Sequence, residues 1–263
     1  NRYASSFRGF DYLNYDAQLS EEQKLIRDSI RAWVNQSVIP IIEPCAENNE
    51  FPKHLIKELG KIGAFGPHIP TQYGGGGLDT ISYGLIMQEL ERGDSGIRSC
   101  ASVQSSLVMY PIWKFGSETQ KQTFLPKLAN GEFIGSFGLT EPNHGSDPAS
   151  METTIIRKNG KYILNGAKMW ITNAPVCDLA VVWATNEDGH VLGCIVERNM
   201  KGFTTPTIKG KWSLRASITG ELIFDEVEIP EENILPLAKG LKAPLSCLSS
   251  ARLGISFGVL GAA

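Results

Sequence analysis

The sequence predicts an α+β protein with three consecutive parts: an all-helical part over residues 1–132, a β-rich part over 133–236, and a helical segment over 237–263. Between about 20 and 130, apolar residues recur at three- and four-residue steps, as on one face of a helix. From 133 the pattern changes to short β-branched and aromatic runs separated by turn residues. A helical pattern resumes over 244–263. We expect an antiparallel β-barrel or sandwich in the middle and the first helix of a helical bundle at the end.

The first part is expected to hold five helices. Ser20 and Gln23 form a capping box that starts the first helix. Its apolar face is predicted to comprise Leu25, Ile26, Ile30, Trp33, Val34 and Val38. Pro40 is expected to end it, because proline disrupts a helix interior. The next helices are predicted over 52–63, 79–92, 95–113 and 117–128, and residues 1–18 are irregular.

Glycines occupy positions 74–77, after Tyr73. This run lacks the Lys-Ser/Thr ending and the preceding apolar strand of a phosphate-binding loop. We therefore interpret it as a flexible connector.

The middle part contains five strand-like runs, at 154–156, 162–164, 179–183, 192–196 and 222–224. Turns are expected at Asn159-Gly160, Asn165-Gly166, Asp188-Gly189 and Thr219-Gly220, because such dipeptides are typical of hairpins. Residues 230–236 read as a linker. The last helix is expected to place Leu248, Arg252, Ile255 and Val259 on one face.

Composition excludes several classes of function. The chain has 263 residues, is 42% hydrophobic and carries a net charge of −3, which gives no reason to expect nucleic acid or an anionic membrane as partner. No apolar run approaches the ~20 residues of a membrane span, so no membrane insertion is expected. Five cysteines without C-x-x-C indicate free thiols. The four histidines are scattered, so no metal site is predicted. Both ends look cut, and a missing targeting peptide therefore excludes little.

Two motifs indicate a binding site. Residues 137–147 read F-G-L-T-E-P-N-H-G-S-D, an apolar strand end followed by a polar loop. Such a loop offers backbone N–H groups and hydroxyls to the acceptors of a large planar cofactor. Residues 165–173 then read N-G-A-K-M-W-I-T-N, which places an aromatic ring beside a hydroxyl. Each motif alone is most often a simple turn or a core tryptophan.

Together, and in this order, the motifs resemble the flavin-binding middle domain of the acyl-CoA dehydrogenases, whose pattern is G-L-T-E-x-x-x-G-S-D followed by K-x-W-I-T. The resemblance implies the acyl-CoA dehydrogenase fold with FAD as cofactor. It also implies FAD contacts from Phe137, Gly138, Leu139, Thr140, Glu141, Pro142, Asn143, Gly145, Ser146, Trp170, Ile171 and Thr172.

Particular roles follow from the same resemblance. Thr140 would bond the pyrimidine edge of the flavin, Trp170 would cover one face, and Thr172 would donate near the hydride-accepting nitrogen. The place of Glu141 is structural rather than that of a base. His144 departs from the commonest family pattern, which has a small residue there, and fits if it points to solvent.

A polar stripe of Arg98, Ser102 and Ser105 runs along an otherwise apolar helix. A buried arginine needs an anion, which could be Glu89, Glu91 or Asp94. The run 89–109, the T-E-P-N-x-G-S-D-P motif, residues 211–217 and the chain's end resemble the glutaryl-CoA dehydrogenases within the family. There the matching arginine binds the far carboxylate of the substrate, for which a bidentate guanidinium is a natural partner.

Residues 245–252 combine serines, apolar positions and an arginine. They could line a tunnel for the CoA chain or form a packing helix with a surface arginine, and the family position favours CoA contact. The substrate-binding residues implied by the resemblance are Arg98, Ser99, Ser102, Ser146, Leu245, Ser246, Cys247, Leu248, Ser249, Ser250, Ala251 and Arg252.

The resemblance implies FAD-dependent oxidation and decarboxylation of glutaryl-CoA to crotonyl-CoA and CO2, by α-proton abstraction and hydride transfer. It further implies electron-transfer flavoprotein as acceptor, a role in lysine and tryptophan degradation, a homotetramer, and a mitochondrial matrix or bacterial cytoplasmic location. The family's catalytic Glu lies in a Tyr-Glu-Gly-Thr setting that is absent up to Ala263, so no catalytic residue is assigned and no turnover is expected from residues 1–263 alone.

Three alternatives remain open. A short-chain acyl-CoA dehydrogenase or oxidase would keep the fold, although Arg98 counts against an oxidase. A relative that does not decarboxylate would stop at glutaconyl-CoA. A catalytically incomplete flavin- or CoA-binding fragment would serve as a scaffold.

Overall fold

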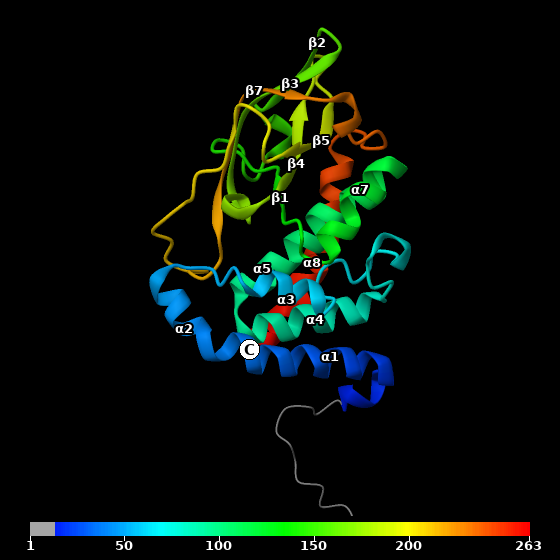
Figure 1. Ribbon diagram of the computed structural model, residues 1–263, viewed down its shortest axis with the longest axis vertical. Helices are drawn as coiled ribbons and strands as arrows, with labels where there is room; N and C mark the ends of the chain where they lie inside the picture. Colours follow the sequence, from blue (N-terminus) through cyan, green and yellow to red (C-terminus); the bar gives the residue numbers. More distant parts are fainter. Residues whose placement is uncertain (1–13) are drawn as a thin grey trace, which may run out of the picture.

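The computed structural model of the chain describes residues 14–263, with the helices α1–α5 gathered at one end, the sheet at the other, and α7 beside the sheet (Figure 1). The helices are α1 (Glu21–Trp33), α2 (Ile39–Asn48), α3 (Leu55–Lys61), α4 (Thr80–Gly93), α5 (Ser95–Ser102), α6 (Tyr110–Phe115), α7 (Glu118–Ala129) and α8 (Lys242–Ala262). The strands are β1 (Gly135–Gly138), β2 (Thr154–Lys158), β3 (Lys161–Thr172), β4 (Leu179–Thr185), β5 (Val191–Glu197), β6 (Phe203–Thr204) and β7 (Thr219–Ile229). This order confirms the predicted succession of a helical part, a sheet and a further helix.

The predicted part boundaries at 132 and 236 fall in connecting segments, and the division at those residues stays a prediction. Of the stretch predicted to be irregular, residues 1–13 lie outside the described residues. Within the remainder, Tyr15–Gln18 forms a short 3-10 turn.

The first helix begins as predicted but does not end at Pro40. The Ser20 hydroxyl accepts from the N–H of Gln23, and the Gln23 side chain accepts from the N–H of Ser20. The chain then stays helical through a π-helical turn at Val34–Val38 and into α2. Pro40 lies in the first turn of α2, where proline is tolerated because no intrahelical N–H bond is lost. Leu25, predicted on the buried face, is 69% exposed.

The helix predicted over 95–113 is one helical path interrupted by a π-helical segment, Val103–Met109, between α5 and α6. Gln104 in this segment is fully buried. Its side-chain carbonyl accepts from the N–H of Gly135 at 2.9 Å, and its amide donates to the carbonyls of Leu128 and Phe133. One side chain therefore fixes the start of β1 against the helices, a contact that no sequence pattern predicted.

The glycine run after Tyr73 connects a short 3-10 turn (Thr71–Tyr73) to α4, and two backbone hydrogen bonds hold it against residues 66–69. Gly76 donates to the Gly66 carbonyl and Gly77 to the Ile69 carbonyl, at 3.2 and 2.9 Å. A Cβ on Gly75 would lie 2.2 Å from the Ile69 oxygen, so only glycine allows this close backbone approach.

The sheet has seven strands in the order β1-β4-β2-β3-β7-β6, with β5 paired to β4, and it is mixed rather than purely antiparallel. The hairpin pairs β2–β3 and β4–β5 are antiparallel, whereas β1 pairs with β4 in parallel and β2 meets β4 in parallel at Thr154 and Thr185. A parallel pair joins strands that are distant in sequence. The turn dipeptides, which report only local hairpins, therefore could not predict it.

Two of the four predicted turns are correct. Asn159-Gly160 connects β2 to β3, and Asp188-Gly189 connects β4 to β5. Asn165-Gly166 instead lies inside β3, where the pairing with β7 shifts register and Gly166 adopts φ 135°. Thr219 and Gly220 begin β7 rather than form a turn. Gly166 therefore marks a bulge inside β3 rather than a turn.

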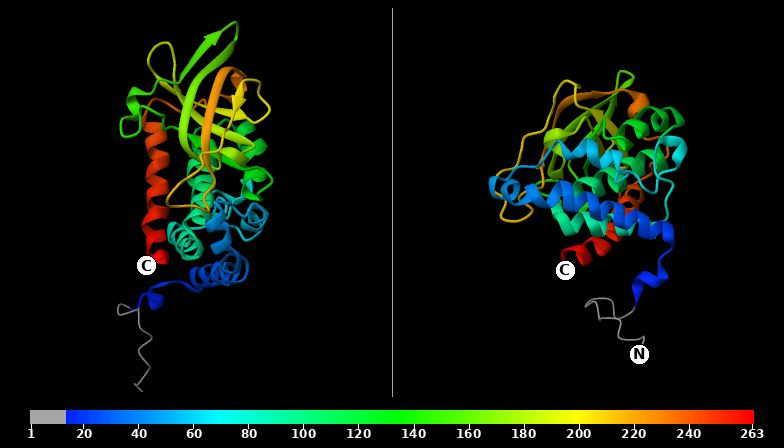
Figure 2. Two further views of the ribbon diagram at one scale, coloured as in Figure 1. Left: turned by 90° about the vertical axis from the view of Figure 1, so that its left-hand side faces the viewer. Right: turned by 60° about the horizontal axis from the view of Figure 1, so that its bottom comes forward.

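The buried residues of helix α8 are mostly small. Ile255 and Val259, predicted to share a face with Leu248 and Arg252, are 49% and 58% exposed. Its buried residues are Ala243, Pro244, Cys247, Ala251, Gly254 and Gly258. A Cβ on Gly84 of α4 would lie 2.5 Å from the Phe257 ring, so the two helices approach closely at this point. The left view of Figure 2 shows α8, in red, running from the sheet down to the helical end of the molecule.

Among the described residues, α8 is the helix long and apolar enough, by length and composition, to cross a membrane. The expectation that no apolar run approaches that length does not hold for this helix. Core helices pass the same test, and the small-residue side of α8 packs against α4. Length and composition alone therefore do not place α8 in a membrane.

Replacing Gly254 by leucine should destabilise the fold by about 1–2 kcal/mol. Overpacking costs about 1–3 kcal/mol, and the better helix propensity of leucine offsets up to about 1 kcal/mol. A Cβ at this position already lies 2.5 Å from the Tyr83 hydroxyl. Urea unfolding measures the change, with Ser256→Leu on the exposed side of α8 as the control. Equal stability of the two variants would contradict the proposed close packing.

Candidate cofactor and substrate site

A central cavity of about 210 Å³ brings together the two sequence motifs and helix α8. Its walls are mostly apolar, with the hydroxyls of Thr140 and Thr172 among them. The residues that line it are Val103, Leu107, Phe137, Leu139, Thr140, Gly145, Pro148, Trp170, Ile171, Thr172 and Leu248. An apolar hollow with a few polar groups is typical of a small-molecule site.

One backbone hydrogen bond joins the two motifs. The loop after β1 turns back on itself, since the N–H of Glu141 donates to the His144 carbonyl at 3.1 Å. The carbonyl of Thr140 accepts from the N–H of Met169, on β3, at 2.9 Å. The segments around Thr140 and Trp170 are thus adjacent walls of one cavity.

Trp170 has a backbone conformation that large residues rarely adopt. Its φ is +62°, and it lies where the pairing of β3 with β7 shifts register between Lys168 and Ile171. Such a conformation costs on the order of 1–3 kcal/mol and often occurs at functional sites. A bulge turns side chains away from the regular alternation of a strand. The Trp170 ring is 57% exposed and lines the central cavity.

An outer cavity of about 470 Å³ shares Trp170 and Thr172 with the central one. Its other lining residues are Ser99, Gly210, Lys211, Trp212, Ser213, Leu214, Ser217 and Thr219. Lys211 holds this loop in shape, because its ammonium donates to the carbonyls of Leu214 and Ser217 and to the Thr219 hydroxyl. The loop was missed as a site, although residues 211–217 were part of the resemblance and were the available signal.

Two larger hollows, of about 610 and 700 Å³, lie away from both motifs. The first is between α7 and residues 231–236, and the second is between residues 48–53 and the loop 207–219. The central cavity is smaller but is the one that both motifs line, so we take it as the candidate site.

The Glu141 side chain is directed away from the central cavity. It is 3% exposed and accepts from the Lys168 ammonium at 2.8 Å and from the N–H groups of Thr153 and Glu152 at 2.9 and 2.6 Å. Burial raises the pKa of Glu141, but the bonds from Lys168, Thr153 and Glu152 outweigh it and leave the pKa below its ordinary value. The carboxylate is therefore ionised and structural, as the resemblance implied.

Four other residues predicted to contact the cofactor do not line the cavity. Gly138 is buried in β1, and Pro142, Asn143 and Ser146 are exposed in the loop that follows. Phe137, Leu139, Thr140, Gly145, Trp170, Ile171 and Thr172 do line it.

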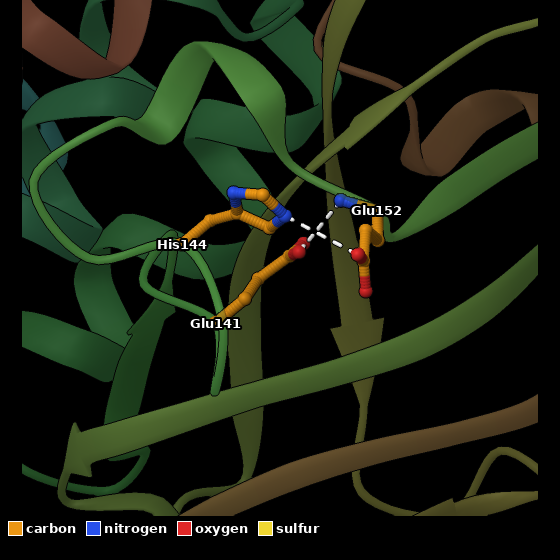
Figure 3. Close-up of side chains that lie close together, drawn as sticks. All are labelled: Glu141, His144 and Glu152. Atoms are coloured by element: carbon orange, nitrogen blue, oxygen red, sulfur yellow. Dashed lines mark hydrogen bonds and ion pairs between the residues drawn. The ribbon is translucent and has the colours of Figure 1, made fainter.

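His144 faces Glu152 rather than solvent (Figure 3). Its Nε2 lies 3.3 Å from a Glu152 carboxylate oxygen, and ligand atoms of Glu141, His144 and Glu152 lie within 4.8 Å of one another. Such a group resembles a metal site in composition. However, the Glu141 carboxylate is already neutralised by the Lys168 ammonium at 2.8 Å, with which a cation would compete. We interpret the three residues as a hydrogen-bonded cluster, in which His144 meets the Glu152 carboxylate and the Glu152 N–H donates to Glu141.

Arg98 forms an ion pair with Glu91 of α4, one of the alternatives that the sequence left open. Its side chain is 12% exposed, and it lies beside Gly258 of α8. Glu89 instead pairs with Arg31 and Arg92. Arg98 lines neither the central nor the outer cavity, whereas the adjacent Ser99 lines the outer one.

The α8 residues predicted to contact CoA differ in their surroundings, and their contact with CoA stays a prediction. Leu248 lines the central cavity, whereas Cys247 and Ala251 are buried against other elements. The hydroxyls of Ser246 and Ser249 donate to carbonyls of their own helix. The Ser250 hydroxyl forms a hydrogen bond with that of Ser106. Arg252 is exposed, and Leu245 is 37% exposed. Ser102, which was also predicted to contact the substrate, is buried in α5. Both alternatives for this segment, CoA contact and a packing helix, therefore stay open.

Two family models match the chain: the acyl-CoA dehydrogenase N-terminal domain over residues 20–132 and the acyl-CoA dehydrogenase middle domain over 136–227. An acyl-CoA dehydrogenase of Bacillus subtilis is 40% identical over 93% of this chain and 66% of its own length. A short-chain-specific acyl-CoA dehydrogenase of Clostridium acetobutylicum is 35% identical over 94% of this chain and 67% of its own length.

Among solved structures, a glutaryl-CoA dehydrogenase of Mycobacterium smegmatis in complex with FADH2 is 48% identical, with a TM-score of 0.93. The match covers 95% of this chain and 64% of that one. The chain thus spans about two thirds of the length of the relatives it matches.

Proposed function

The chain belongs to the acyl-CoA dehydrogenase family, and we propose that it forms the FAD- and acyl-CoA-binding part of a glutaryl-CoA dehydrogenase. FAD is the cofactor of this family, and the residues of the central cavity fit a flavin ring. Apolar walls from Phe137 and Leu139 suit its hydrocarbon rings, and the Thr140 and Thr172 hydroxyls suit its polar edge. The half-exposed Trp170 ring offers a flat surface beside them.

The observation that carries the proposal is the pair of motifs meeting at this cavity, since a flavin needs aromatic and hydroxyl contacts at one place. Thr140 and Thr172 would hold the flavin, and Trp170 would cover one face. When bound, FAD supplies the hydride acceptor for oxidation of the Cα–Cβ bond. The chain's own task is to bind and orient, because alignment of the reacting groups lowers the barrier.

Arg98 is proposed to hold the far carboxylate of glutaryl-CoA. Its guanidinium has five N–H donors, so the ion pair with Glu91 does not exhaust it. Glu91 would hold the guanidinium in place, and Ser99 lines the neighbouring cavity. The 48% identity to a glutaryl-CoA dehydrogenase supports this substrate class.

The finer parts of the proposal follow from the same assignment. The reaction would release CO2 and leave crotonyl-CoA, within lysine and tryptophan degradation. Electrons would pass to electron-transfer flavoprotein from a homotetramer in the mitochondrial matrix or bacterial cytoplasm. Among the described residues, no acidic side chain lines the central cavity. The catalytic base would therefore come from outside these residues.

One observation favours a second candidate, a short-chain acyl-CoA dehydrogenase. Arg98 is already paired with Glu91 and lines neither cavity, as a purely structural arginine would. A relative at 35% identity is specific for short-chain substrates.

Flavin reduction separates the two candidates. The full-length protein that contains this chain, loaded with FAD and kept anaerobic, is mixed with glutaryl-CoA or butyryl-CoA while the flavin absorption is followed. Rapid bleaching by glutaryl-CoA alone is the expected result. Faster bleaching by butyryl-CoA would overturn the glutaryl assignment but keep the family activity.

A further inference from the structure

Lys168 is a charged residue at the centre of the sheet. It is 0% exposed and lies on β3, two residues before Trp170. Its ammonium donates to the Glu141 carboxylate at 2.8 Å and to the Leu139 carbonyl at 3.2 Å. Burial lowers the pKa of Lys168, and Glu141 opposes that effect. A buried ammonium is tolerated only with such partners, so its position depends on the loop after β1.

The Glu141 carboxylate also accepts hydrogen bonds from two further residues. Besides Lys168, its carboxylate accepts from the N–H groups of Glu152 and Thr153, which precede β2. The loop after β1, the segment before β2 and strand β3 therefore meet at one carboxylate. Charge-assisted bonds of this kind are the stronger class of hydrogen bond.

The two walls of the central cavity continue directly from this pair. Leu139 and Thr140, which form one wall, immediately precede Glu141. Trp170, in the other wall, follows Lys168 across the bulge. Lys168 is the last residue of β3 paired with β7 before the register shifts, so it marks where the bulge begins.

We propose that Glu141 and Lys168 are a positioning pair that fixes the spacing of the two walls of the central cavity. This inference rests on the proposed function, because the walls are taken to hold FAD. Neither side chain lines the cavity, so the pair acts through the backbone segments that it joins.

The test compares Lys168→Met, Glu141→Gln and the double variant with the unchanged full-length protein. Glu89→Gln is the matched control, because Glu89 is also a buried carboxylate, 1% exposed, but lies on α4 with Arg31 and Arg92 as partners. Three quantities are measured: the dissociation constant of FAD, the unfolding midpoint without FAD, and hydrogen exchange at the Met169 amide, which bonds Thr140.

We expect Lys168→Met to weaken FAD binding about 10- to 100-fold, since small misplacements of a site have effects of that size. It should also lower the unfolding midpoint and speed exchange at Met169. In the double variant the unfolding midpoint should return most of the way to that of the unchanged protein, because no buried charge is left unpaired. Its FAD binding should stay weakened and its exchange at the Met169 amide should stay faster. Glu89→Gln should lower the midpoint without changing FAD binding.

Two results would overturn the inference: recovery of FAD binding together with the midpoint in the double variant, or unchanged FAD binding in Lys168→Met. The first would show that the pair only neutralises buried charge. An unchanged protein that binds no FAD would overturn the proposed function instead. In that case faster Met169 exchange in the double variant still supports the positioning of the walls, and unchanged exchange refutes it.

Discussion

Replacing Arg98 by glutamine is expected to weaken glutaryl-CoA binding by some tens to thousands of fold, on the order of 2–5 kcal/mol. The cost arises because the substrate carboxylate would lose its charged partner. Arg98 is suited to this role, since its side chain is 12% exposed and Glu91 orients it. Butyryl-CoA has no far carboxylate, so its binding should change little.

The measurement is anaerobic flavin reduction at a series of glutaryl-CoA and butyryl-CoA concentrations in the full-length protein. Arg92→Gln is the matched control, because Arg92 pairs with Glu89 at the end of α4 and is not placed in the site. Equal losses for both substrates in Arg98→Gln would make Arg98 a structural ion-pair member and would favour the short-chain alternative.

Lowering the pH from 6.5 to 4 should reduce the free energy of unfolding by about 2–3 kcal/mol through His68 alone, since each pKa unit corresponds to about 1.4 kcal/mol. Burial lowers the pKa of His68 from 6.5 to about 4. Between these pH values the unfolded chain binds a proton that the folded chain excludes. The stabilisation is thus fully present above pH 6.5 and is lost as the pH falls towards 4. The expected change is smaller than the full pKa shift would give because His68 is only half-buried.

Surroundings of the ring support this pH dependence. The buried Nε2 of His68 has no hydrogen-bond partner among the described residues, and the ring packs against Tyr83 and Tyr110. Urea unfolding at several pH values measures the effect in the unchanged protein and in His68→Phe. His54→Phe, at an exposed position, is the control. The same pH slope in both histidine variants would contradict the assignment to His68.

Local features of the fold were predictable from sequence, whereas long-range ones were not. The Ser20 cap and the Asn159-Gly160 turn were predicted because each depends on a few neighbouring residues. The parallel pairing of β1 with β4 joins segments about forty residues apart, and no local pattern encodes it. The hydrophobic pattern did not indicate which face of α8 is buried, because glycines such as Gly254 allow closer packing than the larger residues that dominate such a pattern.

For the site, the motifs contain residues that line the central cavity and neighbours that do not. Thr140, Trp170 and Thr172 line the central cavity, whereas Ser146 does not. A loop sequence indicates which residues are near a ligand but not which way each side chain points. Leu107 was missed because its place at the cavity depends on the π-helical segment, which rotates the helix faces after residue 103.

The packing of α8 on α4 has a consequence for the order in which the chain folds. Phe257 packs against Gly84 of α4, and Tyr83 packs against Gly254 of α8. The helical core therefore joins residues that are far apart in the sequence. Contacts so distant along the chain form late, because a long loop must close first. During synthesis α4 would stay partly uncovered until the whole sheet had been made. A translation product that stops after α7 would therefore expose an unfinished apolar core to aggregation.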